Sequence, residues 1–397
     1  MRKMNRCFAS TISFFMLAGL LPTNVQADLK DNTMLTAVEL EGTSLLDELE
    51  GNINEVKGQA LYGDDEFVTA IVELEEAPVM DYYDSSSYFS LDEENSAGES
   101  VSKFLASDDI KEVSEELLDN QKNIISEITT LVNENANEGV NVASISEETV
   151  EVINNWTTIV NAISIRVPYR MLDKIRALDG VKRAYVEHVY DRPEPIENSV
   201  VEEGKATYSY SYDMVGVEEA WNQGYTGKGM LVAVLDSGLD IKRNWWDAQI
   251  SRVHEAFTDN SFKSGNPTDG VDDWDLRYTN ESLEEFLKDN QLISTTGADG
   301  SHITYDNNML YKNVKVPYAA DYADGDLDVS PLSSNHGTHV AGTIAGFAST
   351  EEGEVKFSGI APDAQILAMK VFPDADGGAQ EGVLINALED SLRLGAD

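Results

Sequence analysis

Two histidines lie in a setting that suits acid–base chemistry. His336 and His339 are three positions apart in the segment NHGTHVAGTIAG, residues 335–346. In a helix, residues three apart share a face, and an imidazole exchanges a proton near neutral pH. The alternative interpretation is a buried helix of small residues with one structural histidine, since histidine is often buried without a chemical role.

A carboxylate is predicted at the end of a buried strand. Residues 231–235 are a continuous apolar run that ends at Asp236, which is typical of a parallel strand covered on both faces. In open α/β sheets, chemistry gathers outside the carboxyl ends of the strands. The turn residues Ser237 and Gly238 would expose the carboxylate there. An acid that is only solvated at a strand end is the alternative.

These segments and a third resemble the subtilisin-like serine proteases, or subtilases. VAVLDSGLD at 232–240 is similar to the segment that carries their catalytic aspartate, and residues 335–346 to the one that carries their histidine. GIAPDAQILAMKVF at 359–372 is similar to the loop and strand that follow. The resemblance extends from about residue 213 to 397. The spacing of 100 between aspartate and histidine, and KVPYAADYADGDLDV at 315–329, are most similar to the cell-envelope proteinases of the lactocepin and complement-peptidase subgroup.

The resemblance implies a serine endopeptidase that hydrolyses peptide bonds in proteins. Acyl transfer of this kind needs a nucleophile, a base, and an acid that orients the base. Carried over to this sequence, Asp236 is the orienting acid and His336 the general base, while His339 matches a position that is usually structural. No cofactor is required for this chemistry.

The nucleophile of that triad is absent from the sequence. The family segment Gly-Thr-Ser followed by Met and Ala does not occur, and neither does the segment that carries the oxyanion asparagine. Loss of the nucleophile costs about 10⁶ in turnover, so we expect the chain as written to be inactive. We expect the serine to lie beyond residue 397, and residues 206–397 to be the amino-terminal part of a truncated catalytic domain.

Two alternative functions remain open from the sequence. A metal hydrolase could use His336, His339 and a carboxylate, but zinc helices usually carry two histidines four apart with a glutamate between them; here Gly337 and Thr338 intervene. The second is a non-catalytic secreted remnant that acts as a propeptide-like inhibitory or binding module.

Residues 1–27 predict an export signal. They have a basic start, an apolar core over 8–21, and the small-x-small ending VQA at 25–27. The core is too short to be a stable membrane anchor. Cleavage after residue 27 removes Cys7, the only cysteine, which leaves neither a disulfide nor a thiolate nucleophile. We therefore expect a secreted or cell-envelope protein of a bacterium.

A small α+β domain is predicted at about residues 67–190. Its expected elements are strands over 67–74, 157–167 and 181–189 and helices over 110–132 and 169–178. Their order predicts a compact ferredoxin-like sandwich, interrupted by a flexible insert at 81–100. Placed before a protease-like domain, it is similar to the subtilase propeptide, which would span 28–205 and act as an intramolecular inhibitor. An unrelated α+β domain is the alternative.

The rest of the chain predicts an α/β domain behind a linker. Residues 190–212 are rich in Pro, Glu and Ser and read as an exposed linker in which we expect the maturation cut. The resemblance implies a subtilisin-like parallel sheet with helices on both faces, incomplete at residue 397. Residues 364–372 predict a buried strand and 380–394 a helix. The insertion at 241–330 is too long for a plain loop, and we expect it to line part of the substrate cleft.

The balance of charge is strongly acidic. There are 72 Asp and Glu residues against 28 Lys and Arg, a net charge of -44. Phosphates would be repelled, which excludes nucleic acid as a partner, whereas proteins and peptides are the substrates that the resemblance implies. Asp321, Asp324, Asp326 and Asp328 could supply hard oxygen ligands to a structural calcium ion. A solvated acidic loop is the alternative, because the glutamate of a twelve-residue calcium loop is missing.

Overall fold

The computed structural model describes residues 62–83, 96–135, 150–192, 212, 214–243, 250–265, 267, 275–290, 292–293, 307–332, 334–375 and 377–397. By its internal contacts the chain divides into two compact units, Met1–Glu66 and Phe67–Asp397. The predicted export signal and most of the predicted linker lie outside the described residues. Within the described part, no helix is both long and apolar enough to cross a membrane.

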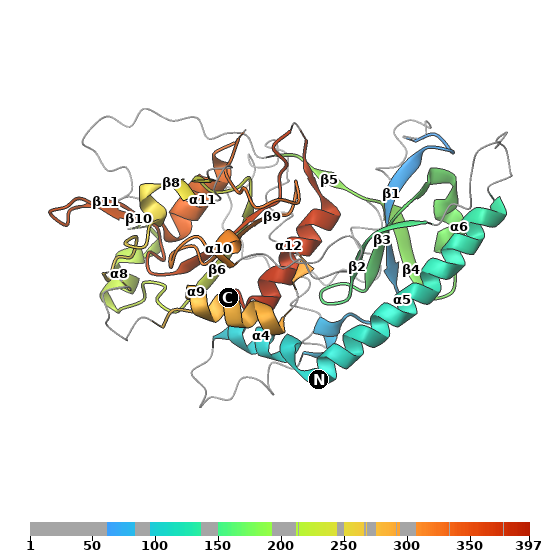
Figure 1. The fold of residues 1–397 in the computed structure, drawn as a ribbon, viewed down its shortest axis with the longest axis horizontal. Helices are drawn as coiled ribbons and strands as arrows, with labels where there is room; N and C mark the ends of the chain where they lie inside the picture. The colour runs from blue at the N-terminus through green and yellow to red at the C-terminus, as the bar shows by residue number, and fades with distance from the viewer. Residues whose placement is uncertain are drawn as a thin grey trace, which may run out of the picture. The chain divides into compact units, whose positions relative to one another are not determined.

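Three parallel strands form the sheet on which the candidate site is built. Strand β12 (Gln365–Lys370) lies between β6 (Leu231–Asp236) and β9 (Tyr318–Asp321), and both pairings are parallel. Figure 1 labels β6 and β9, the two outer strands of this sheet. Every residue of β12 is buried, as expected for a central strand covered on both faces. The predicted strands at 231–235 and 364–372 are thus confirmed.

The other elements of this α/β domain connect and cover the sheet. In chain order they are α8 (Val217–Asn222), β7 (Ile241–Arg243), β8 (Ile250–Val253), η4 (Glu255–Phe257), α9 (Asn280–Asp289), α10 (Asn307–Leu310), α11 (His336–Ala345), β10 (Phe347–Ser349), β11 (Val355–Ser358), β13 (Ala379–Gln380) and α12 (Glu381–Arg393). Strands β7 and β8 form one antiparallel pair, and β10 and β11 another.

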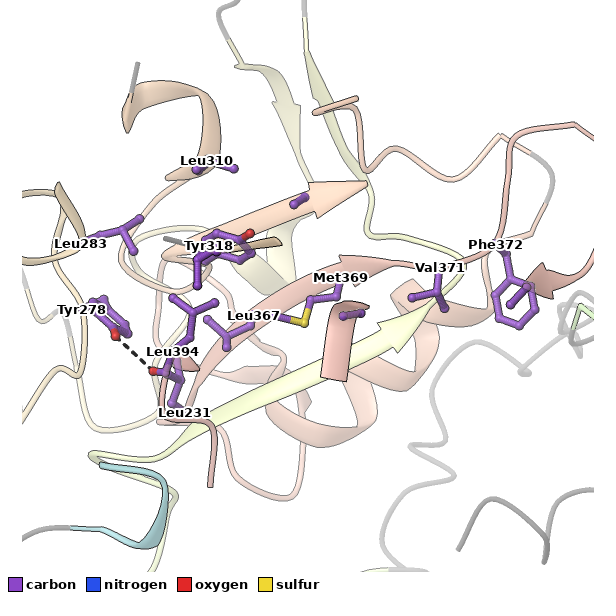
Figure 2. Close-up of a cluster of buried hydrophobic side chains, with 14 residues drawn as sticks. Leu231, Tyr278, Leu283, Leu310, Tyr318, Leu367, Met369, Val371, Phe372 and Leu394 are labelled. Carbon is purple, nitrogen blue, oxygen red and sulfur yellow. Dashed lines mark hydrogen bonds between the residues drawn. The ribbon is translucent and has the colours of Figure 1, made fainter. Parts of the chain in front are cut away.

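Helices lie on both faces of the sheet, as the subtilisin-like fold requires. Side chains alternate between the two faces of a strand. Met369 of β12 packs in a buried cluster with Ala387 of α12, drawn in Figure 2. Ala368, the preceding residue, packs in a second cluster with Ala341 of α11. The predicted α/β fold class is therefore confirmed.

The long insertion contributes to the first of these clusters. Tyr278, Leu283 and Leu310 belong to it together with Leu231 and Leu367 of the sheet (Figure 2). The Tyr278 hydroxyl also donates a hydrogen bond to the Leu394 carbonyl, at 3.1 Å. Part of the insertion therefore completes the domain core, while its expected place along a substrate cleft stays a prediction.

The α+β domain has ferredoxin-like topology. Its elements are β1 (Phe67–Leu74), η2 (Val79–Tyr82), α4 (Ala97–Ala106), α5 (Asp108–Asn135), β2 (Glu151–Trp156), β3 (Ala162–Pro168), η3 (Tyr169–Met171), α6 (Leu172–Arg176), β4 (Val181–Val186) and β5 (Val189–Tyr190). The four long strands pair antiparallel in the order β2-β3-β1-β4. With α5 and α6 as the connections, this is the βαββαβ arrangement.

Two details of this domain differ from the sequence prediction. The strand expected at 157–167 begins at Ala162, because Thr157 and Thr158 instead accept backbone hydrogen bonds from the η2 segment. The expected flexible insert at 81–100 contains the start of helix α4. Its N-cap Ser96 and Glu99 form a reciprocal capping box, a signal that was readable in the sequence.

Candidate active site

The structure brings Asp236 and His336 into direct contact. Asp236 ends strand β6 and His336 begins helix α11. The His336 Nδ1 atom is 2.9 Å from each carboxylate oxygen of Asp236. Because an ionised carboxylate only accepts hydrogen bonds, Nδ1 carries the hydrogen of this pair. The proton-accepting lone pair of the imidazole therefore lies on Nε2.

The two residues meet because of where their elements end and begin. Strands β6 and β12 are in register to their last residues, Asp236 and Lys370, so the carboxylate stands at the carboxyl edge of the sheet. Helix α11 begins against the turn that follows β6. A Cβ atom on Gly337 would lie 2.4 Å from the Gly238 carbonyl oxygen, so only glycine permits this approach.

Ser237 joins the two segments through a buried hydroxyl group. Its Oγ donates to the Ser334 carbonyl and accepts from the Gly337 amide, both at 3.0 Å. The side chain thus ties the turn after Asp236 to the first turn of the histidine helix. In the sequence Ser237 is recognisable only as a turn residue after Asp236, because both of its partners lie about 100 positions away.

His339 takes no part in this contact. It is exposed, and its carbonyl accepts the Thr343 hydroxyl one turn further along α11. Among the residues that the structure describes, no group of three or more His, Cys, Asp or Glu side chains is placed to hold a metal ion. The metal-hydrolase alternative therefore gains no support.

The predicted calcium ligands make other contacts. Lys370, whose side chain is 1% exposed, lies at ion-pair distance from Asp321, from Asp324 at 2.8 Å and from Asp374 at 3.0 Å. An ammonium group thus sits among the carboxylates, where a divalent ion would have to bind. The Asp326 and Asp328 carboxylates accept the amides of Asp328 and Ser330. These residues do not fit a calcium ion.

The ion-pair cluster changes the acidity of its members. Burial raises the pKa of Asp321 to about 6, although hydrogen bonds from Lys370 and from the Asp324 amide oppose the shift. Burial lowers the pKa of Lys370, but its hydrogen bonds to the carboxylates outweigh burial and raise it above its ordinary value. Burial raises the pKa of Asp324, yet its bonds to Lys370 and Asp374 leave it lowered. The cluster is a charged contact that joins the end of β9 and the loop after it to the end of β12.

A short strand of the α/β domain pairs with the α+β domain. Ala379 and Gln380 of β13 pair antiparallel with Tyr190 and Val189 of β5. At the start of α12, the Glu381 carboxylate lies 2.9 Å from His188 Nδ1 and accepts the Tyr185 hydroxyl at 3.1 Å. The last segment of the α+β domain is thus held along the edge of the α/β domain.

The side of α12 carries a polar stripe that meets the α+β domain. The Trp156 indole donates to Asn386 at 2.7 Å, and the Glu389 carboxylate accepts the amides of Thr158 and Ile159 at 2.9 and 3.2 Å. Burial raises the pKa of Glu389 to about 7, although Arg393 and these two amides lower it. The helix predicted over 380–394 is confirmed, but no local pattern in the sequence indicates its polar stripe.

Comparison with known proteins confirms the resemblance drawn from the motifs. Residues 227–397 match the family described as the subtilase family. The chain is 30% identical to the PII-type proteinase of Lactococcus lactis subsp. cremoris over 244 residues. This alignment covers 60% of this chain and 10% of the proteinase.

Two further relatives match part of the chain. The minor extracellular protease Vpr of Bacillus subtilis (strain 168) is 23% identical, and the alignment covers 62% of this chain and 23% of Vpr. The C5a peptidase of Streptococcus pyogenes serotype M3 is 31% identical, and the alignment covers 43% of this chain and 12% of the peptidase. The chain thus spans about a tenth of the length of the lactococcal proteinase.

Proposed function

We propose that this chain, whose residues 227–397 form a subtilase-family segment, is the amino-terminal part of a secreted serine endopeptidase that hydrolyses proteins. The observation that carries the proposal is the contact of His336 Nδ1 with both oxygens of Asp236 at the end of the parallel sheet. Relatives of several times this length support a nucleophilic serine that follows residue 397 in the complete protein.

The pair performs the proton transfers of acyl transfer. His336 Nε2 takes the proton of the serine hydroxyl as Oγ attacks the peptide carbonyl, and then gives it to the leaving amine. Asp236 holds the imidazole with its hydrogen on Nδ1 and stabilises the imidazolium that forms. A water molecule then repeats the sequence on the acyl-enzyme, with His336 again as base.

We further propose that residues 28–205 are a propeptide that follows a signal at 1–27. The pairing of β5 with β13 supports this role, since an extended segment of the α+β domain adds a strand to a short strand of the protease segment. The module would inhibit the enzyme until the chain is cut within 190–212 and the module is released. This function places the protein outside the cell or in the cell envelope of a bacterium.

The test is to express the reading frame past codon 397 and to measure hydrolysis of a fluorescently labelled protein. We expect activity once a Gly-Thr-Ser-Met-Ala segment is included. Asp236→Asn should lower kcat by about 10⁴, because the imidazole then adopts the wrong tautomer. Lys288→Ala, which removes an exposed ion pair with Glu284, is the matched control and should retain activity.

Two results would count against this function. One is a reading frame that stops at codon 397, which would favour the non-catalytic inhibitory module. The other is full activity in the folded Asp236→Asn variant.

A further inference from the structure

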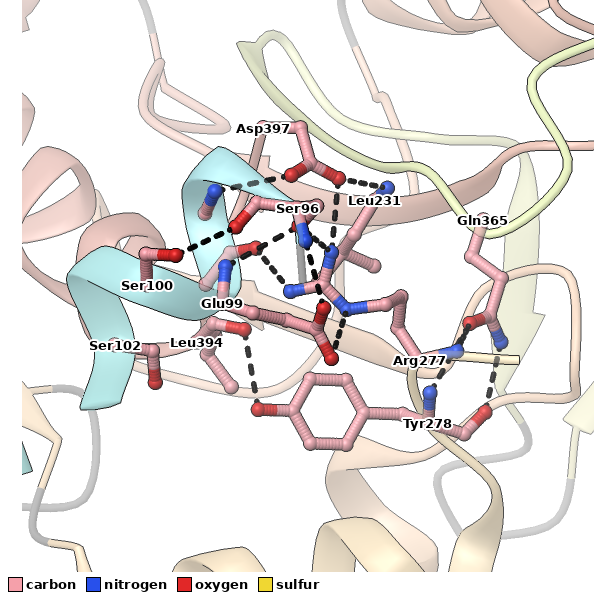
Figure 3. Close-up of polar contacts among 12 residues, drawn as sticks. Ser96, Glu99, Ser100, Ser102, Leu231, Arg277, Tyr278, Gln365, Leu394 and Asp397 are labelled. Atoms are coloured by element: carbon pink, nitrogen blue, oxygen red, sulfur yellow. Dashed lines mark hydrogen bonds and ion pairs between the residues drawn. The ribbon is translucent and has the colours of Figure 1, made fainter. Parts of the chain in front are cut away.

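Helix α4 contacts the α/β domain at a place separate from the candidate active site. Its N-terminal turn lies against Arg277 and the segment 395–397. Figure 3 shows the contacts of Arg277 and Asp397 with this turn. The Ser102 hydroxyl, one turn further along, donates to the Arg393 carbonyl at 2.6 Å. This contact is made by the predicted insert of the α+β domain, not by its sheet.

The surface that receives α4 is held in place by the α/β domain itself. The Gln365 side chain accepts the amides of Arg277 and Tyr278 at 2.8 and 3.1 Å and donates to the Tyr278 carbonyl at 2.7 Å. The Asp397 side chain accepts the Leu231 amide at 3.0 Å. The side chains of Arg277 and Asp397, which are 9% and 6% exposed, also form an ion pair at 2.9 Å. We call Arg277, Gly395 and Asp397 the α4 docking surface.

The start of α4 is complementary to this surface. Arg277 donates to the N-cap hydroxyl of Ser96 at 2.6 Å, and its Nε lies 3.6 Å from the Glu99 carboxylate. The Asp397 carboxylate accepts the Gly98 amide at 3.1 Å. The carboxylate thus satisfies an amide in the first turn of the helix, where the helix dipole favours negative charge.

Gly98 provides independent evidence that the contact is close. A Cβ atom at this position would lie 2.2 Å from the Gly395 carbonyl oxygen and 2.5 Å from that of Ala396. Glycine in a helix costs about 1 kcal/mol relative to alanine, and its backbone here is not left-handed. The close approach of the two backbones is therefore what requires a glycine in this helix.

Apolar packing and the remaining interface reinforce the contact. Phe104 and Leu105 of α4 are buried in a cluster against which Leu392 of α12 packs. Glu381 and Glu389 of α12 also contact the α+β domain. The α+β domain therefore contacts α12 from its first residue to its last turn. Several contacts that join the same two domains raise each other's effective concentration. The α+β domain is therefore released only when all of these contacts are broken together.

We propose that α4 is a latch that holds the α+β domain on the α/β domain after the chain is cut in the linker. The role of this latch in regulation rests on the function proposed above, in which the α+β domain inhibits the protease. Cutting within 193–211 would then leave the α+β domain bound to the α/β domain. Activation would need a separate step in which α4 dissociates from the α4 docking surface.

The experiment uses the full 397-residue chain with a site-specific protease sequence placed within 193–211. After complete cleavage, we measure whether the two pieces co-elute in size-exclusion chromatography, and their dissociation rate by exchange with a labelled amino-terminal piece. Wild-type pieces should co-elute. Gly98→Val on the helix and Arg277→Ala on the docking surface should each speed dissociation about tenfold or more, as for loss of a buried hydrogen bond to a charged group.

A double variant and a control distinguish the latch from general destabilisation. Because both changes break one contact, Gly98→Val with Arg277→Ala should dissociate little faster than Gly98→Val alone. Lys288→Ala should match wild type. Separation of the wild-type pieces upon cutting, or variants that dissociate at the wild-type rate, would overturn the latch. Neither readout depends on protease activity, so failure of the proposed function leaves this test intact.

Discussion

At the scale of single residues, the Ser237 hydroxyl group ties the turn after Asp236 to the helix that begins at His336, because it donates to the Ser334 carbonyl and accepts the Gly337 amide. Asp236 and His336 were identified by a strand-ending carboxylate, a glycine-rich helix and the resemblance of both segments to one family. Ser237 was not, because hydrogen bonds of a turn serine to residues almost 100 positions away leave no local pattern. The sequence did not reveal that Lys370 pairs with the acidic residues 321–328, because Lys370 lies on β12 and only the fold brings that strand beside them.

Ser237→Ala should destabilise the protein and misplace the histidine. It leaves the buried Ser334 carbonyl and Gly337 amide without a partner, so we expect the free energy of unfolding to fall by about 1–3 kcal/mol. Denaturant unfolding measures this. Thr130→Ala, which removes an exposed hydroxyl bond within α5, should change the value by less than about 0.5 kcal/mol. Equal stability of both variants would show that the Ser237 bridge contributes nothing.

At the scale of elements, long apolar patterns were predictable and polar contacts between elements were not. The strands at 231–236 and 365–370 and helices α5 and α12 follow from runs and periodicity of apolar residues, which tertiary burial then enforces. Helix α4 was missed because a polar composition outweighed its capping box. The hydrogen bond between Arg277 and its N-cap Ser96 joins residues about 180 positions apart, so no local pattern in the sequence reveals it.

Lys370→Met should be strongly destabilising. It leaves the carboxylate of Asp321, whose side chain is 0% exposed, without its partner, and breaking a buried pair in this way costs about 3–5 kcal/mol. Thermal unfolding at neutral pH measures the loss. An exposed counterpart is Lys122→Ala in α5, whose pair with Asp119 is solvent-exposed and should contribute less than about 1 kcal/mol.

Metal removal tests the same cluster. Because the Lys370 ammonium group lies among the carboxylates of Asp321, Asp324 and Asp374, where a cation would bind, a chelator should leave the wild-type melting temperature unchanged. A fall of several degrees on chelation, restored by calcium, would contradict the assignment of this loop to a lysine-centred ion pair.

At the scale of the whole molecule, pH acts on the contact between the two domains. The pKa of Glu389 is about 7 in the folded chain against an ordinary value of 4.5. A raised carboxyl pKa means that the folded state binds more protons between these values, so stability falls as pH rises from about 4.5 to 7. Asp321 and Glu187, whose pKa values are also raised by burial, act in the same direction. The net charge of -44 adds repulsion as the carboxylates ionise.

We therefore expect a higher melting temperature at pH 5 than at pH 8. Glu389→Gln, which cannot ionise, should reduce this difference, whereas Glu284→Gln at an exposed position of α9 should not. Calorimetry at the two pH values decides the matter. A melting temperature that rises towards pH 8, or a Glu389→Gln variant with the full wild-type difference, would contradict the role given to this carboxyl group.

The central claim is that His336, oriented by Asp236, is the base of a serine protease. It is tested most directly by covalent labelling of the protein expressed from the reading frame extended past codon 397, with a fluorophosphonate probe that reacts only with an activated serine. The account predicts one labelled serine after a Gly-Thr pair, loss of labelling in His336→Ala, and wild-type labelling in His339→Ala. Labelling that persists in the folded His336→Ala variant would contradict it.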